Sequence, residues 1–154
     1  MSEKSIANVI NIDPPILIRY VKPSYIVNGE VGEEIFQLRE DRSPPEEYIS
    51  FFHSKKATID EKINDIRLIL EKRKFKIKKT SGFIFLNILN ALEDINATND
   101  IILFKEEDYP HYGMYYVSDE DMDIQEAKTI LLYHYELYLN ANLEKVVSVK
   151  AVAR

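Results

Sequence analysis

The chain has 154 residues, 20 Lys plus Arg against 26 Asp plus Glu, and 45% hydrophobic residues, which predicts one folded domain of ordinary size. It contains no cysteine, which excludes a disulfide framework, a thiol nucleophile and a cysteine-based zinc site. The net charge of −6 argues against nucleic-acid binding over the whole surface, although a local basic patch could still act.

Further classes are excluded by local patterns. No apolar run approaches the length of a membrane span, and no secretion signal precedes Asp13, so we expect a cytoplasmic protein without a membrane partner. The four glycines cannot be arranged into a dinucleotide-binding motif or a phosphate-binding P-loop. We expect residues 1–12 to be a flexible N-terminus and residues 13–154 to form a single α+β domain.

The first third is typical of extended structure. Residues 16–21, 33–38 and 47–52 are short, rich in branched or aromatic side chains, and bounded by turn residues, so each predicts a strand. Asn28 and Gly29 tolerate positive φ angles and predict a tight turn.

The middle of the chain changes to a helical period. From Thr58 onward, Ile59, Ile63, Ile66 and Leu70 fall on one helical face, and Thr58 with Glu61 forms a capping-box pattern. A second helix is predicted from Ser81, with its apolar face made by Phe85, Leu86, Leu89, Leu92 and Ile95.

The last third returns to strands at 100–104 and 112–117. A third helix is predicted from near Ser118 to near Asn140, with Ile124, Ala127, Leu131, His134 and Tyr138 on its inner face, and residues 145–153 predict a final strand. The predicted order is βββααββαβ, which indicates an α+β fold with a mixed or largely antiparallel sheet and three helices.

Residues 72–79 are the sharpest anomaly in composition, because six of these eight residues are basic in an acidic protein. They could contact a polyanion, such as a nucleic-acid backbone, or form a solvated edge that discourages aggregation. In an extended connector, Phe75 and Ile77 would point inward. The candidate contact residues are Lys72, Arg73, Lys74, Lys76, Lys78 and Lys79.

Acidic and aromatic residues gather later in the chain, where seven of the ten tyrosines lie between Tyr109 and Tyr138. Tyrosine is enriched at protein interfaces, and carboxylates suit a basic partner. His111 is the histidine that we expect to be exposed. The predicted partner-binding surface comprises Glu106, Glu107, Asp108, Tyr109, His111, Tyr115, Asp119, Glu120 and Asp121.

The pattern predicts no metal site, no cofactor and no catalytic residue. The carboxylates do not match a calcium loop, and the three histidines do not have metal-ligand spacing.

Several pieces of the chain resemble a group of small uncharacterised bacterial proteins that share an Arg-x-x-x-Pro-Ser-aromatic-Ile-x-x-Gly motif. The resemblance implies no reaction, and the strip at 72–79 is unusually charged for it. The matching positions are Arg19, Pro23, Ser24, Tyr25, Ile26, Gly29, Phe36, Ser50, Pro110 and His111.

The leading hypothesis is a bacterial cytoplasmic protein-interaction module, not an enzyme, such as an immunity protein, antitoxin or phage-defence accessory with a partner that carries a basic groove. One alternative is an NAD-consuming transferase or a hydrolase-like enzyme, because Arg19, Ser50 and Glu106 or Glu107 follow the order of such a site if they converge in one cleft. The other alternative is nucleic-acid contact through residues 72–79.

Overall fold

The computed structural model describes residues 12–41 and 43–140. A six-stranded sheet has the order β6-β7-β4-β1-β5-β8, and every neighbouring pair is antiparallel. The predicted α+β class with a largely antiparallel sheet and three helices is therefore confirmed. The six strands are β1 (Ile16–Val21), β4 (Ile49–Phe52), β5 (Gly82–Asn87), β6 (Ile102–Asp108), β7 (His111–Tyr116) and β8 (Tyr135–Leu139).

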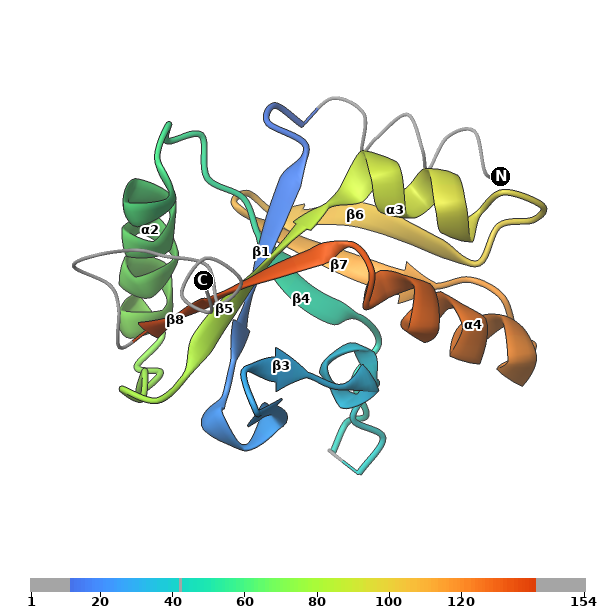
Figure 1. Cartoon of the computed structure of the whole chain (residues 1–154), viewed down its shortest axis with the longest axis horizontal. Helices are drawn as coiled ribbons and strands as arrows, with labels where there is room; N and C mark the ends of the chain where they lie inside the picture. The colour runs from blue at the N-terminus through green and yellow to red at the C-terminus, as the bar shows by residue number, and fades with distance from the viewer. Residues whose placement is uncertain (1–11, 42, 141–154) are drawn as a thin grey trace.

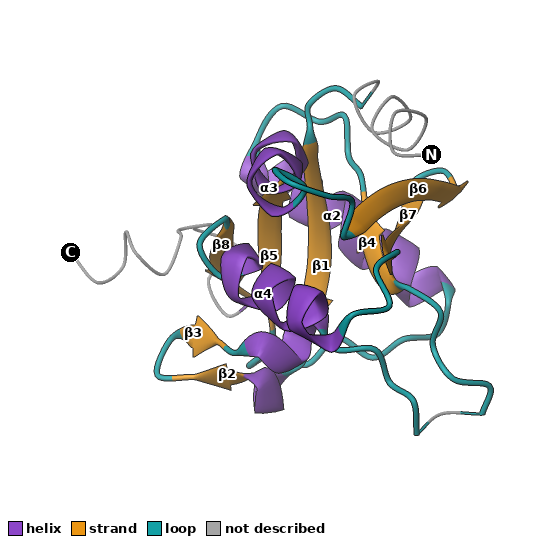
Figure 2. Cartoon of the chain, turned by 90° about the vertical axis from the view of Figure 1, so that its right-hand side faces the viewer, coloured by secondary structure: helices purple, strands orange, loops and turns teal. Residues whose placement is uncertain are grey.

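Helices cover both faces of this sheet, as Figures 1 and 2 show. Helix α2 (Ile59–Lys72) packs Ile63, Ile66 and Leu70 against one face. Helices α3 (Ile88–Ile95) and α4 (Asp121–Leu131) pack against the other face. Alternating strand side chains supply both cores, which places the sheet as the middle of three layers.

Short elements lie beyond the end of β1 (Figure 2). They are the 3-10 helices η1 (Pro23–Tyr25) and η2 (Glu33–Phe36), and the small hairpin of β2 (Ile26–Val27) and β3 (Glu30–Val31). Asn28 and Gly29 both have positive φ angles, of 54° and 76°, which confirms the predicted tight turn.

Helix α2 begins as its sequence predicts. The Thr58 hydroxyl accepts from the Glu61 N–H, and the Glu61 carboxylate accepts from the Thr58 N–H, so the capping box is complete.

Two of the predicted elements are wrong. Residues 33–38 do not form a strand, because Ile35 and Phe36 are both buried on one side of the 3-10 helix η2, whereas consecutive strand residues point to opposite faces. Residues 82–87 form the strand β5 rather than the start of a helix. This strand lies between β1 and β8 with both faces covered, and Asn87 then caps α3 by accepting from the Asn90 N–H.

The third helix is shorter than predicted, and residues 135–139 form the edge strand β8. Leu137 and Tyr138 are buried on opposite faces of the sheet, which is a strand pattern. Phe75 was expected to point inward but is 45% exposed. The predicted final strand at 145–153 and nearly all of the predicted flexible N-terminus lie outside the described residues.

Candidate functional site: a cationic cleft at the end of β1

Strands β1 and β4 pair at a single register position, Ile18 with Phe52. Beyond this position, the side chain of Arg19 connects the two strands. The Arg19 guanidinium donates from Nη1 to the Ser50 carbonyl oxygen at 2.9 Å and from Nε to the Ile35 carbonyl oxygen at 3.0 Å. Two carbonyl bonds in a planar fork fix both the position and the orientation of this cation. Arg19 therefore links β1, β4 and η2 at one point.

A cavity of about 410 Å³ lies at this point, lined by β1, η1, η2, β4 and the end of α2. Its walls combine positive charge with flat apolar surface. Four basic side chains and two carboxylates line it, namely Arg19, Lys22, Arg39 and Arg73 with Glu34 and Glu46. The apolar wall is made by Tyr20, Tyr25, Ile35, Phe52, Leu70 and Phe75, and Ser50 and Gln37 complete the lining. We call this cavity the cationic cleft.

The C-terminus of α2 directs two side chains to the cationic cleft. Lys74 has a φ angle of 61°, the Phe75 N–H donates to the Leu70 carbonyl, and the Lys74 N–H donates to the Glu71 carbonyl. This pattern is a Schellman motif, which usually has glycine at the position of Lys74 and brings the residue after it against the last helical turn. Phe75 and Leu70 consequently lie on the same wall, and the Phe75 ring meets the Tyr20 ring edge-on at 5.0 Å.

Arg73, the C-cap residue, lies above the cleft wall with its guanidinium 5.4 Å from the centre of the Phe52 ring. Among the described residues, no carboxylate forms an ion pair with Arg73. Its charge is therefore available to a ligand, and its side chain is exposed.

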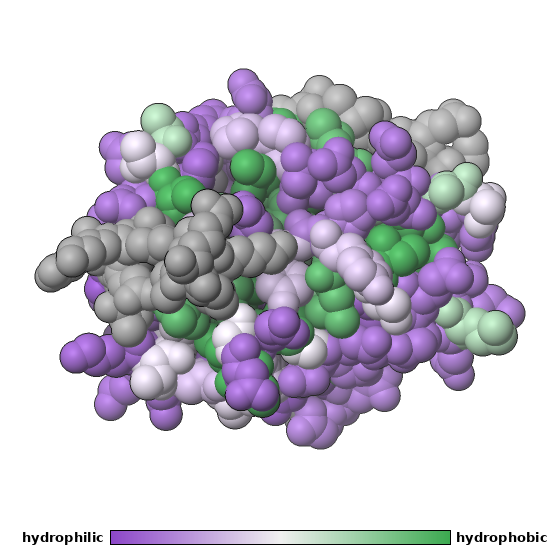
Figure 3. Space-filling model, in the orientation of Figure 1, coloured by the Kyte–Doolittle hydropathy of each residue, from purple (hydrophilic) through white to green (hydrophobic). Residues whose placement is uncertain are grey.

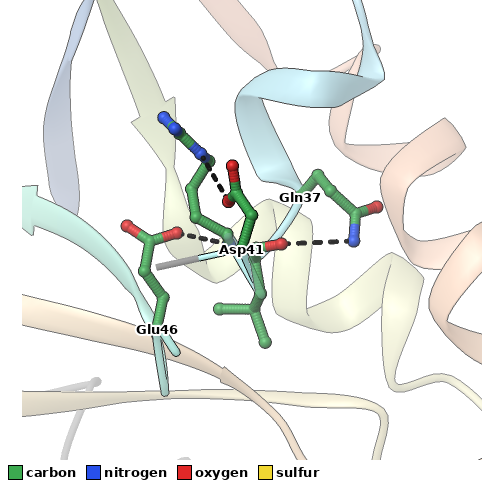
Figure 4. A network of polar contacts seen from close by, with 5 residues as sticks. Gln37, Asp41 and Glu46 are labelled. Carbon is green, nitrogen blue, oxygen red and sulfur yellow. Dashed lines mark hydrogen bonds and ion pairs between the residues drawn. The ribbon is translucent and has the colours of Figure 1, made fainter. Parts of the chain in front are cut away.

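One of the two cleft carboxylates, that of Glu46, is engaged by the loop that follows η2 (Figure 4). The Glu46 carboxylate accepts from the Arg39 N–H at 2.6 Å, and the Glu46 N–H donates to the Arg39 carbonyl at 3.1 Å. Arg39 in turn pairs with Asp41 through Nε at 3.3 Å. These contacts hold Arg39 and Glu46 side by side at the rim of the cationic cleft.

His111 lies beside the cleft on the α2 side of the sheet. Its ring stacks on Phe52 with centroids 5.1 Å apart, and its Nε2 lies 3.2 Å from the Ser50 hydroxyl. Burial, and to a lesser extent the charge of Arg73, lowers the pKa of His111. We expected His111 to be exposed, and this was wrong, because it is 7% exposed.

The predicted partner-binding residues fall into two groups at opposite ends of the β6–β7 hairpin. Glu106, Glu107, Asp108 and Tyr109 lie at its tip, whereas Asp119, Glu120 and Asp121 lie at the start of α4. The Val117 N–H donates to the Ile101 carbonyl, which fixes the second group near the beginning of β6. The structure therefore presents two separate acidic surfaces.

Three tyrosines of the β6–β7 hairpin are tied to neighbouring groups. Tyr109 is 42% exposed, and its hydroxyl lies 2.8 Å from His53 Nδ1. The Tyr115 hydroxyl donates to the Glu107 carboxylate at 2.5 Å, and burial with this bond raises the pKa of Tyr115. Burial and the Glu106 carboxylate raise the pKa of Tyr112 to about 12.

The residues that the NAD-consuming alternative requires do not all converge in one cleft. Arg19 and Ser50 both line the cationic cleft, but neither Glu106 nor Glu107 does.

The six candidate polyanion-contact residues at 72–79 are all exposed, and one of them, Arg73, also lines the cleft. Lys22 and Arg39 were missed, since Lys22 fills an unspecified position of the motif that begins at Arg19 and Arg39 stands in a run of mixed charge with no excess of either sign.

The chain matches no protein-family model, and no curated protein or solved structure shows significant similarity to it. Within residues 12–41 and 43–140, no group of three or more histidine or carboxylate side chains is placed to hold a metal ion. No helix in the same residues is long and apolar enough to cross a membrane.

Proposed function

We propose that the protein binds a small organic anion with a flat apolar part in the cationic cleft. The observation that carries this proposal is the meeting of four basic side chains with an aromatic wall in one cavity of a protein whose net charge is −6. Guanidinium groups suit carboxylate and phosphate ligands, and flat rings suit aromatic or heterocyclic ones. A ligand that carries both parts would use both walls.

Arg19 and Arg73 have different parts in this proposal. Arg19 is held by two protein carbonyls, so its charge stands at a fixed place in the cleft without any cost of ordering on binding. Arg73 has no described carboxylate partner and closes the cleft from the α2 side. It is the side chain whose removal should weaken binding without disturbing the fold.

Calorimetric titration with phenyl phosphate and with inorganic phosphate tests the proposal, because the two probes share the anion and differ in the ring. We expect phenyl phosphate to bind at millimolar or lower concentration and more tightly than inorganic phosphate. Arg73→Gln should weaken this binding about tenfold, the effect of one lost charge-assisted bond. Lys105→Gln, which removes a positive charge from β6 outside the cleft, should leave it unchanged. No binding of either probe, or equal losses in the two variants, would reject the proposal.

A second candidate function is the protein-interaction module, at the tip of the β6–β7 hairpin. It is favoured by the exposure of Tyr109, which follows the exposed residues Glu106 and Asp108 at this tip. An immunity protein, antitoxin or phage-defence accessory would use such a surface against a basic partner. Pull-down from the native host with wild type and a Tyr109→Ala, Asp108→Lys variant tests it. The candidate predicts a stoichiometric protein that only the wild type captures.

A further inference from the structure

The basic strip at residues 72–79 and the cationic cleft form one continuous surface. Arg73 and Phe75 belong to both, because the Schellman motif at the end of α2 directs them to the cleft while the lysines on either side remain exposed. We propose that this combined surface binds single-stranded nucleic acid, with one nucleotide in the cationic cleft and the adjoining phosphates along residues 72–79. This inference rests on the proposed function and names its ligand class.

The charge of the strip is not neutralised by the protein. No carboxylate of the described residues forms an ion pair with any of its six basic side chains. Ile77 packs partly into the core beneath α2, so it anchors the strip while its neighbours Lys76 and Lys78 are exposed. Hydrogen bonds fix the backbone of Lys78 at three points, since its N–H donates to the Tyr20 hydroxyl and its carbonyl accepts from Ser81 and Asn140. The strip is thus a positioned row of cations rather than a loose tail.

The aromatic side chain in the strip favours a nucleic acid over other polyanions. Phe75 is 45% exposed, and the edge of its ring is supported by Tyr20. Proteins that bind single strands combine a basic track with aromatic rings on which bases stack, and stacking tolerates any base. A polyphosphate or an acidic peptide would use the lysines and leave Phe75 without a contact.

The shape of the site favours a single strand over a duplex. The cationic cleft is a concave cavity, and aromatic rings form part of its lining. A base that is paired and stacked in a duplex cannot enter such a cavity without being unpaired, and this unpairing costs a few kcal/mol. An unpaired base can enter directly.

Fluorescence anisotropy with a labelled oligothymidylate of about 12 nucleotides, a length within the usual range of single-strand sites, tests the inference. Binding should weaken steeply with salt. Contacts to four phosphates give a slope of about −2.8 for log K against log salt, or roughly a 50-fold loss between 50 and 200 mM. A duplex of the same length should bind more weakly.

Variants separate the two parts of the surface. Lys76→Gln with Lys78→Gln should weaken binding and reduce the salt slope by about 1.4, while the matched double variant Lys55→Gln with Lys105→Gln should leave both unchanged. Phe75→Leu keeps an apolar side chain on the cleft wall with Leu70 but removes the stacking face, and it should weaken oligothymidylate binding at least fivefold.

Each outcome has a definite meaning. Equal losses in the two double variants, equal binding of the duplex, or binding that does not depend on salt would overturn the inference. If phenyl phosphate binds in the cleft and oligothymidylate does not bind, the nucleic-acid inference fails and the proposed function stands. If neither binds, both fail.

Discussion

Arg19 donates from Nη1 to the carbonyl oxygen of Ser50 at 2.9 Å, so a side chain joins β1 to β4 where their pairing register has ended. The guanidinium connects the two strands where they separate, and it places a positive charge there. Residues from this part of β1 and β4 and from the end of α2 line the cationic cleft.

Arg19→Lys should destabilise the fold. Lysine keeps the charge but cannot donate in a planar fork to the two carbonyls, so one or both of these oxygens would lose their partner. We expect a loss of about 1–3 kcal/mol in the free energy of unfolding, measured by urea denaturation. Arg39→Lys, at a solvent-accessible pair with Asp41, should leave it nearly unchanged. A smaller effect at Arg19 than at Arg39 would contradict the bridging role.

Lys74→Gly should stabilise the protein. Lys74 has a φ angle of 61°, a left-handed conformation that glycine adopts without the clash of a Cβ atom. We expect a gain of roughly 0.5–1 kcal/mol in thermal or urea unfolding, since relief of the strain exceeds the added entropy of the unfolded chain. Lys72→Gly, inside the last turn of α2, should instead cost about 0.5–1 kcal/mol. Two losses of equal size would show that Lys74 is not strained.

Gly113→Ala should destabilise the centre of the sheet. A Cβ atom at this position would lie 2.7 Å from Tyr48 Cδ1, too close for that ring, and 3.1 Å from Tyr115 Cε1, a tight contact. Displacing packed rings costs typically about 1–3 kcal/mol. Urea denaturation measures the loss, and an unchanged midpoint would show that the Tyr48 ring moves freely.

Acid should destabilise the protein through His53 and His111. Burial lowers the pKa of both side chains in the folded state, so the unfolded chain binds protons more readily than the folded one. Their contribution is complete above the unfolded pKa of about 6.5 and is lost as the pH falls through the lower folded-state values. Urea unfolding across this range should show falling stability, and His111→Gln should flatten the slope. A rise in stability on acidification would reverse the sign and contradict the account.

The hydrogen bonds of His53 also fix its tautomer. Nε2 lies 2.9 Å from the Pro14 carbonyl oxygen, which can only accept, so Nε2 carries the proton. Nδ1 then accepts from the Tyr109 hydroxyl at 2.8 Å. Nitrogen chemical shifts of the ring should report this tautomer at neutral pH, and a proton on Nδ1 alone would refute the assignment.

Local signals in the sequence predicted an element correctly where a single local interaction determines that element. Thr58 and Glu61 predicted the start of α2 because a capping box satisfies the first N–H groups of a helix directly. Asn28 and Gly29 predicted their turn for a similarly local reason.

The errors arose where tertiary burial overrode local periodicity. Phe85, Leu86, Leu89 and Leu92 fit a helical face, yet the first two belong to β5, a strand covered on both faces that needs no alternation. Tyr138 fitted the helical stripe of α4 but lies in β8, after a turn that no Gly or Pro marks.

The basic strip was visible in the sequence, but the cationic cleft was not. Arg19, Arg39 and Arg73 are far apart along the chain and converge only because β1, the loop after η2 and the end of α2 meet. On the face in Figure 3, apolar side chains form scattered patches among hydrophilic ones.

The most direct test of the proposed function is a two-dimensional ¹H–¹⁵N NMR titration of the full chain with phenyl phosphate. The Arg19 Nε–H is held by the Ile35 carbonyl and therefore provides a probe inside the cationic cleft. We predict saturable shifts of this Nε–H signal and of the Phe75 and Tyr25 amides, weakened in Arg73→Gln. Shifts confined to the β6–β7 hairpin tip, or no shifts at all, would contradict a ligand site in the cleft.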